Sequence, residues 1–139
     1  MNRVVLDTNV ILSSLLQPLG PPAKALYLVR SGFLTLCVSG PVYAEYEEVL
    51  QRPRFSRIES GIKPMLGFIR ERSLWVRPAE SVRACSDADD DVFLECAQAA
   101  RASWIVTGNV RDFPLVWQGT AIVTPRQFLD SLEATEKGR

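Results

Sequence analysis

Acidic residues occur at several points of the sequence where an apolar, strand-like run comes to an end. Asp7 directly follows Val4–Leu6, and Glu45 lies a few residues after the apolar run 33–38. The carboxyl ends of parallel strands meet at one edge of a sheet, so acids at these points are expected to lie together. The other acids in comparable positions are Asp87, Asp89, Asp90, Asp91 and Asp112.

A cluster of carboxylates predicts metal-dependent chemistry. Like charges at close range repel one another, so such a cluster persists only with protons or bound cations. The chain contains no histidine, which excludes histidine-dependent nucleases, Ser-His-Asp hydrolases and histidine-ligated metal sites. Oxygen ligands by themselves select Mg²⁺ or Mn²⁺. One or two such ions can activate water and stabilise the leaving oxygen of a phosphodiester, so hydrolysis needs no histidine.

Apolar periodicity indicates the elements that must position these acids. Strand-like runs alternate with helical patterns, which favours a three-layer α/β/α sandwich with a central parallel sheet. We expect one domain over residues 1–132 and a disordered tail over residues 133–139. The predicted strands are 4–6, 33–38, 74–76, 104–106 and 121–123, and the predicted helices are 7–16, 21–32, 39–50, 63–72, 92–102 and 125–132.

Each acid also has a purely structural interpretation. Asp7 precedes a predicted helix and could serve only as its N-cap. Glu45 and Glu47 flank the apolar stripe of their helix on opposite sides, so periodicity does not choose between them. One acid of the group 87–91 would suffice to cap the next helix. Within that group, helical phase favours Asp90 as the inward acid and makes Asp91 the second choice.

Composition limits the remaining possibilities. Lys plus Arg and Asp plus Glu both total 16, so the formal net charge is zero, and any basic surface for a nucleic acid must be local. The spacing of Cys37, Cys85 and Cys96 matches no zinc motif, and we expect free thiols. The N-terminus lacks the features of a signal peptide, and no apolar run approaches the roughly 20 residues that span a bilayer. We therefore expect a cytoplasmic protein without a membrane partner.

Five segments of the chain together resemble the PIN domain family. The first is Val-Val-Leu followed by Asp7-Thr8-Asn9. The second is 39–50, which has Glu45 at the acidic helix position of the family. The others are Asp87–Ala97, Trp104–Asn109 and Ile122–Leu129. Their order and spacing extend over nearly the whole chain, and the chain is most similar to the bacterial toxin components of toxin–antitoxin systems that are like VapC.

The resemblance implies a Mg²⁺- or Mn²⁺-dependent ribonuclease that acts on RNA. It places the main catalytic and metal-binding acids at Asp7, Glu45 and Asp90, with Asp91 as a further metal ligand. Hydrogen bonding in support of these carboxylates is expected from Thr8, Asn9 and Thr107. A cognate antitoxin protein is the implied partner, and we expect a homodimer or higher oligomer.

One residue departs from the family pattern. Many PIN domains carry an aspartate in the loop after the fourth strand, where this chain has Asn109. An amide oxygen can bind an ion or orient water, but it supplies no charge. Asp112 could compensate. Arg52, Arg54 and Arg57 follow the Glu45 helix and could bind phosphates, but a solvated helix end is the favoured interpretation.

Two other functions fit parts of this pattern. The first is a PIN-fold module that binds RNA or protein and has lost most or all catalytic activity, which Asn109 alone favours. The second is a phosphatase of the haloacid-dehalogenase class, which also begins with a strand and an aspartate. That class requires a second aspartate at the position of Asn9, so the second interpretation is disfavoured. A nucleotide-binding fold is disfavoured further, because the chain has no glycine-rich phosphate loop.

Overall fold

The computed structural model describes residues 2–137. Within them, six strands form one sheet in the order β3-β2-β1-β4-β6-β5. All neighbouring strands are parallel except β5 and β6, which are antiparallel. The strands are β1 (Arg3–Leu6), β2 (Thr35–Val38), β3 (Leu74–Trp75), β4 (Trp104–Val106), β5 (Val116–Trp117) and β6 (Thr120–Val123).

The helices begin and end at residues that suit helix termini. Pro21 and Pro22 occupy the first turn of α2, and the side chain of Ser39 accepts a hydrogen bond from the backbone N–H of Val42 at the start of α3. Arg101 ends α5 in the left-handed conformation. The helices are α1 (Thr8–Leu16), α2 (Pro21–Arg30), α3 (Gly40–Leu50), α4 (Glu59–Arg72), α5 (Asp91–Ala100) and α6 (Pro125–Lys137), with the short 3₁₀ helices η1 (Pro53–Ile58), η2 (Ala88–Asp90) and η3 (Val110–Asp112).

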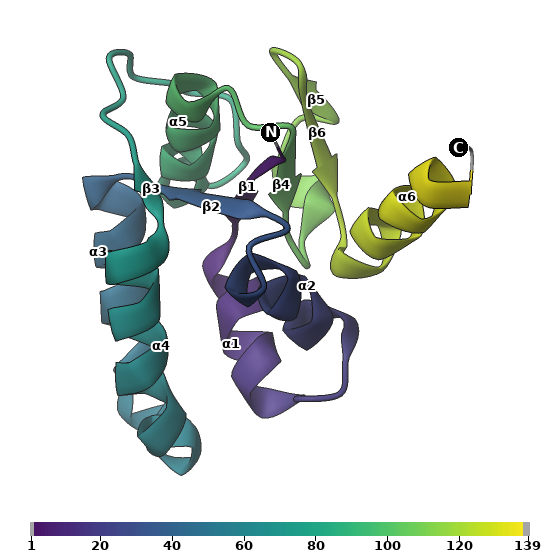
Figure 1. The fold of residues 1–139 in the computed structure, drawn as a ribbon. Helices are drawn as coiled ribbons and strands as arrows, with labels where there is room; N and C mark the ends of the chain where they lie inside the picture. Colours follow the sequence, from purple (N-terminus) through teal and green to yellow (C-terminus); the bar gives the residue numbers. More distant parts are fainter. Residues whose placement is uncertain (1, 138–139) are drawn as a thin grey trace.

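The helices flank the sheet on both faces (Figure 1). α1 and α2 connect β1 to β2, and α3 and α4 connect β2 to β3, whereas α5 leads back to β4 in the opposite direction along the sheet. Right-handed crossovers therefore place α5 on the other face, where it packs on β1, β2 and β4, while α2 packs on α1 and α6. The predicted three-layer α/β/α fold is confirmed.

The centre of the sheet is completely buried. Val4, Val5 and Leu6 of β1 have no exposed surface, and neither do Ile105 and Val106 of β4. Strands covered on both faces are continuous apolar runs, which is why these segments were predictable from the sequence. Their rigidity fixes the residues that follow them at the carboxyl edge.

Three details differ from the sequence-based expectation. The hairpin of β5 and β6 turns through Gln118 and Gly119, both at positive φ; Gln is uncommon there, so the turn signal was weak. Helix α4 begins at Glu59 instead of Lys63. Glycine suits position 61 because a Cβ there would lie only 3.2 Å from the side chain of Leu15 in α1.

The third difference concerns the end of the domain. The sequence predicts that the last helix ends at Leu132 and that a disordered tail follows, but α6 continues through Lys137. Glu and Ala, which occupy positions 133 and 134, are strong helix formers, so the helix has no reason to stop at Leu132. This corrects the expectation for residues 133–137, and residues 138–139 lie outside the described part of the chain.

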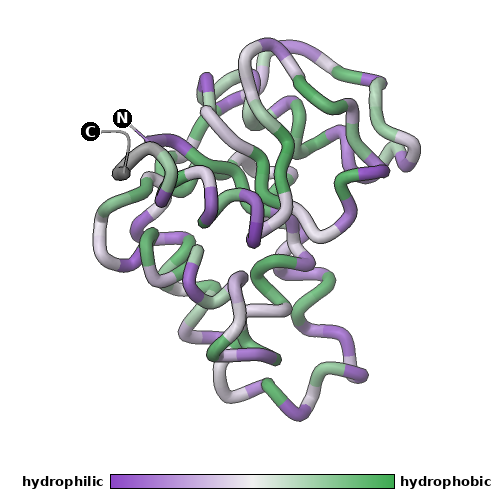
Figure 2. Tube along the Cα trace, turned by 90° about the vertical axis from the view of Figure 1, so that its right-hand side faces the viewer, coloured by the Kyte–Doolittle hydropathy of each residue, from purple (hydrophilic) through white to green (hydrophobic). Residues whose placement is uncertain are grey.

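Hydrophobic and hydrophilic residues alternate along most of the trace (Figure 2). In keeping with this distribution, residues 2–137 include no helix that is both long enough and apolar enough to cross a membrane. Cys37, Cys85 and Cys96 are all free, as expected from their spacing.

Candidate active site

The register of β1 against β4 brings Asp7 and Thr107 side by side. Leu6 pairs with Val106 across the two parallel strands, and the backbone N–H of Asp7 donates to the carbonyl oxygen of Val106 at 2.9 Å. Asp7 and Thr107 therefore leave the sheet at the same level, on the carboxyl edge where the sequence predicts the site. Both side chains are buried, Asp7 with 6% of its surface exposed and Thr107 with none.

The Asp7 carboxylate is held by its neighbours and does not cap a helix. The hydroxyl of Thr107 donates to Oδ2 of Asp7 at 2.7 Å, and the amide of Asn9 donates to the same oxygen at 3.3 Å. The Asp7 side chain makes no capping hydrogen bond to α1. The buried hydroxyl of Thr8 has no hydrogen-bond partner, so the support that Thr8 gives Asp7 comes from its backbone N–H, which lowers the pKa of Asp7. The side chains that support Asp7 are those of Thr107 and Asn9.

Two further hydrogen bonds fix the loop after β4, one to the side chain of Asn9 in α1 and one within the loop itself. The backbone N–H of Gly108 donates to Oδ1 of Asn9 at 3.1 Å, and the N–H of Asn109 donates to the Thr107 hydroxyl at 3.0 Å. The Thr107 hydroxyl is therefore oriented as an acceptor from Asn109 and a donor to Asp7. A single hydroxyl that is fixed in this way leaves Asp7 little freedom to turn.

Three of the acids carry raised pKa values that reveal their proximity. Burial raises the pKa of Asp7, and the charge of Asp112 adds to the effect, while the Thr107 hydrogen bond opposes it. Burial, then Asp7, Asp87, Asp112 and Glu45, raise the pKa of Asp90 to about 7. Burial followed by the charges of Glu48, Asp89 and Asp7 raises the pKa of Glu45, although Arg52 lowers it. These charge effects make Asp7, Glu45, Asp90 and Asp112 electrostatic neighbours, and their assignment as site residues stays a prediction.

Asp91 faces away from this cluster. Its Oδ1 atom accepts hydrogen bonds from the backbone N–H groups of Ala84 at 3.0 Å and Cys85 at 2.8 Å, and only 6% of its surface is exposed. Burial raises the pKa of Asp91, but these backbone hydrogen bonds outweigh it and hold the pKa below its usual range. The expectation that Asp91 is a metal ligand does not fit this geometry, because its carboxylate is already engaged by backbone donors.

One of the acids before α5 caps a helix, and another makes no capping hydrogen bond. Asp87 is the cap, because its Oδ1 accepts from the backbone N–H of Asp89 at 2.9 Å at the start of η2. Asp90 stands at the N-cap position of α5 but makes no capping hydrogen bond. Its carboxylate is therefore left to the acidic cluster, in agreement with the helical phase read from the sequence.

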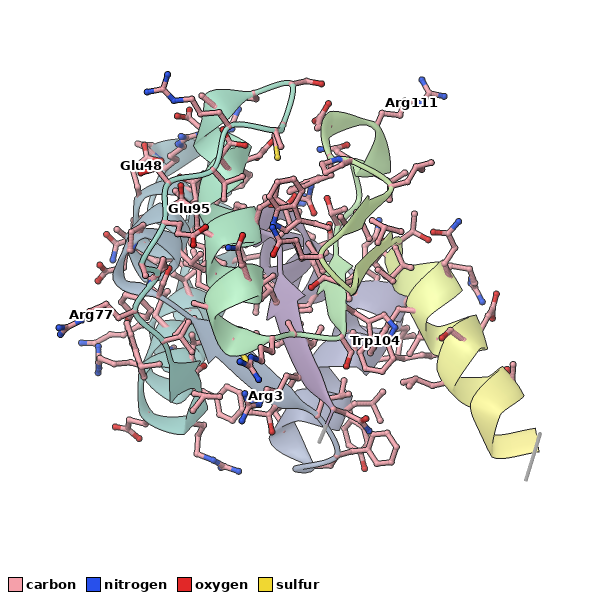
Figure 3. All side chains as sticks on the ribbon, turned by 90° about the horizontal axis from the view of Figure 1, so that it is seen from above. Arg3, Glu48, Arg77, Glu95, Trp104 and Arg111 are labelled. Carbon is pink, nitrogen blue, oxygen red and sulfur yellow. The ribbon has the colours of Figure 1, made fainter. Side chains whose placement is uncertain are left out.

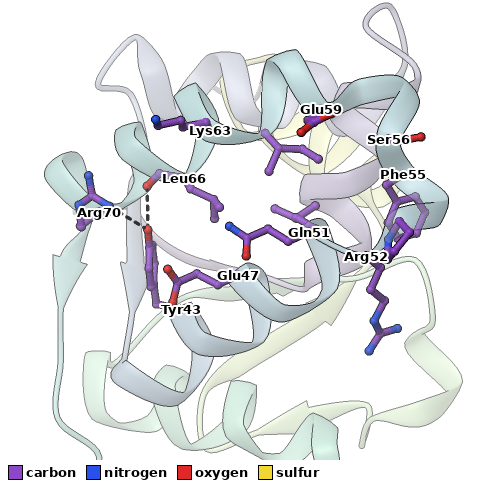
Figure 4. Close-up of a pocket in the computed structure, with 13 residues that line it drawn as sticks. Tyr43, Glu47, Gln51, Arg52, Phe55, Ser56, Glu59, Lys63, Leu66 and Arg70 are labelled. Atoms are coloured by element: carbon purple, nitrogen blue, oxygen red, sulfur yellow. Dashed lines mark hydrogen bonds between the residues drawn. The ribbon is translucent and has the colours of Figure 1, made fainter.

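The position of α4 gives Glu45 and Glu47 different surroundings. A groove of about 660 Å³ lies between α3 and α4, and Glu47 lines it together with Tyr43 and Leu66 (Figure 4). The Tyr43 hydroxyl closes one end by donating to the carbonyl oxygen of Leu66 at 3.3 Å and accepting from Arg70 at 3.5 Å. Glu45 projects to the opposite flank of α3, where Asp7 acts on it. The groove is separate from the acidic cluster.

The loop after β4 contributes Asp112, not Asn109, to the electrostatics of the cluster. Asn109 has an exposed side chain, whereas Asp112 raises the pKa of both Asp7 and Asp90. In η3 the backbone N–H of Asp112 donates to the carbonyl oxygen of Asn109 at 3.0 Å. This hydrogen bond closes the turn from which Asp112 acts on the other acids. Compensation by Asp112 was an open alternative in the sequence, and this geometry favours it.

The side chains of the arginines after α3 contact residues outside the acidic cluster. Arg52 forms a bidentate pair with Glu48, at 2.6 and 3.2 Å, and lowers the pKa of Glu45. Arg54 stacks over the ring of Phe55 at 4.9 Å. These exposed contacts are compatible with the solvated helix end that the sequence favoured.

The donor set suits a hard divalent cation in its chemistry. Every side chain in the cluster offers oxygen, and the raised pKa values indicate negative charge that a cation would relieve. Among residues 2–137, however, no three Asp, Glu or Cys side chains are already gathered closely enough to form a metal site. The acids are neighbours that would have to converge on an ion.

Sequence reasoning missed one polar group directly beneath the site. The hydroxyl of Tyr46, on a side chain with no exposed surface, donates to the carbonyl oxygen of Leu6, the residue before Asp7. Tyr46 lies in the apolar stripe of α3, and its spacing alone indicates a core residue. The signal available was that a buried tyrosine hydroxyl needs a partner, and unpaired carbonyls occur at strand ends.

Comparison with known proteins places this site in a family. The family model described as PIN domain matches residues 3–111. An uncharacterized protein of Methanocaldococcus jannaschii is 29% identical over 110 residues, which cover 77% of this chain and 70% of that protein.

Two solved structures share the fold at low sequence identity. The first, VapBC2 from Rickettsia felis bound to a DNA fragment from its promoter, has a TM-score of 0.54 and 15% identity over 86% of this chain and 96% of that chain. The second is the PIN domain of T. brucei RRP44, with a TM-score of 0.53 and 15% identity over 99% of this chain and 84% of that chain. PIN domains are generally nucleases that use divalent metal ions. Because the family model covers most of the chain, from β1 into η3, and includes Asp7, Glu45 and Asp90, the chain belongs to the PIN domain family.

Proposed function

We propose that this protein is a metal-dependent endoribonuclease that hydrolyses RNA phosphodiesters. The observation that carries the proposal is the group of acids around Asp7, in which burial and the charges of neighbouring acids raise the pKa values of Asp7, Glu45 and Asp90. Acids whose pKa values are raised in this way do not stabilise the fold. The arrangement therefore indicates a functional site, at which a bound cation and a polyanionic substrate would balance the charge.

The proposal assigns a role to each acid. Asp7, Glu45 and Asp90 would hold a Mg²⁺ or Mn²⁺ ion, and Asp112 would add charge at the edge of the site. When bound, such an ion supplies an activated water and neutralises charge on the phosphate. Asp7 is the fixed member, because Thr107 and Asn9 restrain its Oδ2. Asp90, with a pKa of about 7 in the absence of a cation, is suited to hold or release a proton near neutral pH.

The decisive experiment is a cleavage assay on single-stranded RNA with and without Mn²⁺. The wild-type protein should cleave internally when Mn²⁺ is present and stop when the ion is chelated, and Asp7→Asn should abolish cleavage. Asp130→Asn is the matched control, because it removes one exposed carboxylate from α6 and should leave cleavage intact. If pure wild-type protein leaves RNA uncut over a wide range of Mn²⁺ concentrations, the catalytic proposal is wrong.

The biological role that we propose is the toxin of a bacterial toxin–antitoxin pair, acting on RNA in the cytoplasm and bound by a cognate antitoxin. The likeness of the fold to VapBC2 supports this role. Expression of the wild-type chain should arrest growth, and Asp7→Asn should not. Co-expression of a small neighbouring reading frame that encodes a DNA-binding protein should restore growth. We also propose a homodimer or higher oligomer, which sedimentation of the purified chain tests directly.

The inactive binding module is the weaker alternative. Asn109 alone favoured it, and Asp112 supplies the loop's charge to Asp7 and Asp90 in its place. No other feature of the described residues favours loss of activity over retention.

A further inference from the structure

Residues 76–87, which we call the strap, run from β3 to η2 without helix or strand. Three side chains on one face of α5 hold this segment at intervals. Gln98 donates to the carboxylate of Glu80 at 3.0 Å, and Glu95 accepts from the backbone N–H of Val82 at 2.9 Å. Figure 3 shows Glu95 on the side of α5 along which the strap passes. The third of these side chains is Asp91, one turn before Glu95.

Asp91 makes the firmest of the three attachments. One carboxylate oxygen accepts from two successive backbone N–H groups, those of Ala84 and Cys85, and the side chain is almost entirely buried. Two donors converging on one charged oxygen leave the strap a single position at this point. Val82 packs into the core just before it, so the strap is fixed by polar and apolar contacts together.

The anchored end of the strap leads directly into the acidic cluster. The next residue, Ser86, donates its backbone N–H to the carbonyl oxygen of Asp112 at 3.1 Å. Asp87 then caps η2, and its carbonyl oxygen accepts from the backbone N–H of Asp90 at 3.0 Å. The strap thus touches both turns that bring acids to the site, the one with Asp90 and the one with Asp112.

We propose that Asp91 is a positioning residue of the site and not a ligand: by anchoring Ala84 and Cys85 it sets the backbone from which Asp90 and Asp112 reach the cluster. This inference rests on the proposed function. It also explains why two adjacent aspartates at the start of α5 have different duties. Asp90 faces the other acids, and Asp91, about 100° further round the helix, faces the strap.

Two substitutions at Asp91, compared with one at Asp90, test the inference. An asparagine at position 91 keeps an oxygen that can accept both backbone hydrogen bonds, whereas an alanine keeps none. Asp91→Asn should therefore cleave RNA and gain thermal stability from Mn²⁺ nearly as the wild type does. Asp91→Ala should need more Mn²⁺ for half-maximal cleavage, by about tenfold or more. Asp90→Asn, which removes the charge itself, should lose most of both effects.

Hydrogen exchange gives a readout that does not depend on activity. In the full-length wild type the amides of Ala84 and Cys85 should be protected, and Asp91→Ala should expose them while the amides of β1 remain protected. If Asp91→Ala does not fold, the comparison of Asp91→Asn with Asp90→Asn still decides. The inference is overturned if Asp91→Asn loses Mn²⁺ stabilisation as fully as Asp90→Asn does, because Asp91 would then be a ligand.

The failure of the proposed function would look different. A wild-type chain that is neither stabilised by Mn²⁺ nor active on RNA overturns the proposed function and the positioning role with it. A wild type that responds to Mn²⁺, together with an Asp91→Ala variant that exchanges and responds as the wild type does, overturns the positioning role alone.

Discussion

Asp90→Asn should make the metal-free protein more stable while it removes the response to metal. Asp90 has a pKa of about 7, raised first by burial and then by Asp7, Asp87, Asp112 and Glu45. The folded state therefore binds a proton at Asp90 more tightly than the unfolded chain, in which its pKa is near the ordinary value of 3.8. Between these two pKa values the folded state holds more protons, so the stability of the metal-free protein falls as the pH rises.

The size of the effect follows from the shift. A pKa raised from 3.8 to about 7 corresponds to about 4 kcal/mol of unfavourable free energy at pH 8 for a fully desolvated carboxylate. Asp90 is only half-buried, so solvent screens part of the repulsion, and we expect about half of that value, about 2 kcal/mol. For a chain of this length the variant's melting temperature should then rise by about 6 °C at pH 8. Near pH 4 the two proteins should differ little.

Thermal melts from pH 4 to pH 8, with a chelator or with Mn²⁺, measure both parts of this prediction. The wild type should lose stability with rising pH in chelator and regain it in Mn²⁺, whereas Asp90→Asn should show a flatter pH profile and a small Mn²⁺ shift. Asp130→Asn, with its exposed carboxylate, should follow the wild type. The reasoning is refuted if Asp90→Asn is no more stable than the wild type in chelator at pH 8, because Asp90 would then carry no repulsion.

Two further predictions concern the groups around Asp7. Thr107→Val removes the hydroxyl that donates to Asp7 at 2.7 Å and should destabilise the protein by about 1–3 kcal/mol in denaturant unfolding, whereas Thr107→Ser should stay close to the wild type; equal losses in both would assign the effect to packing. Asp112→Asn should weaken Mn²⁺ binding, measured by titration calorimetry, more than Asn109→Asp strengthens it, because only Asp112 acts on both Asp7 and Asp90. A larger effect of Asn109→Asp would mean that residue 109, and not Asp112, is the position in this loop that affects metal binding.

Local chemistry was enough to predict the layers of this fold. The runs that became β1 and β4 are apolar because both of their faces are covered, and the prolines at the starts of α2 and α3 set φ for a first helical turn. The β5–β6 hairpin escaped prediction because its turn places Gln118, an unusual residue, at positive φ. The additional length of α4 and α6 escaped it because helix ends depend on packing and on weak propensities.

The sequence by itself also determined which residue types could act: carboxylates without histidine, placed after strands that share one edge. Strand ends and helical phase indicated Asp7 and Asp90, because they are properties of the chain in one dimension. Glu45 was preferred to Glu47 only through the resemblance to the PIN domain family. Only the tertiary structure decided which acids are engaged elsewhere. Asp91 lies one residue from Asp90, yet its carboxylate binds the strap. Glu47 lies two residues from Glu45, yet it lines the groove towards α4. The strap and α4 reach these side chains from other parts of the chain, and such contacts have no signature in local spacing.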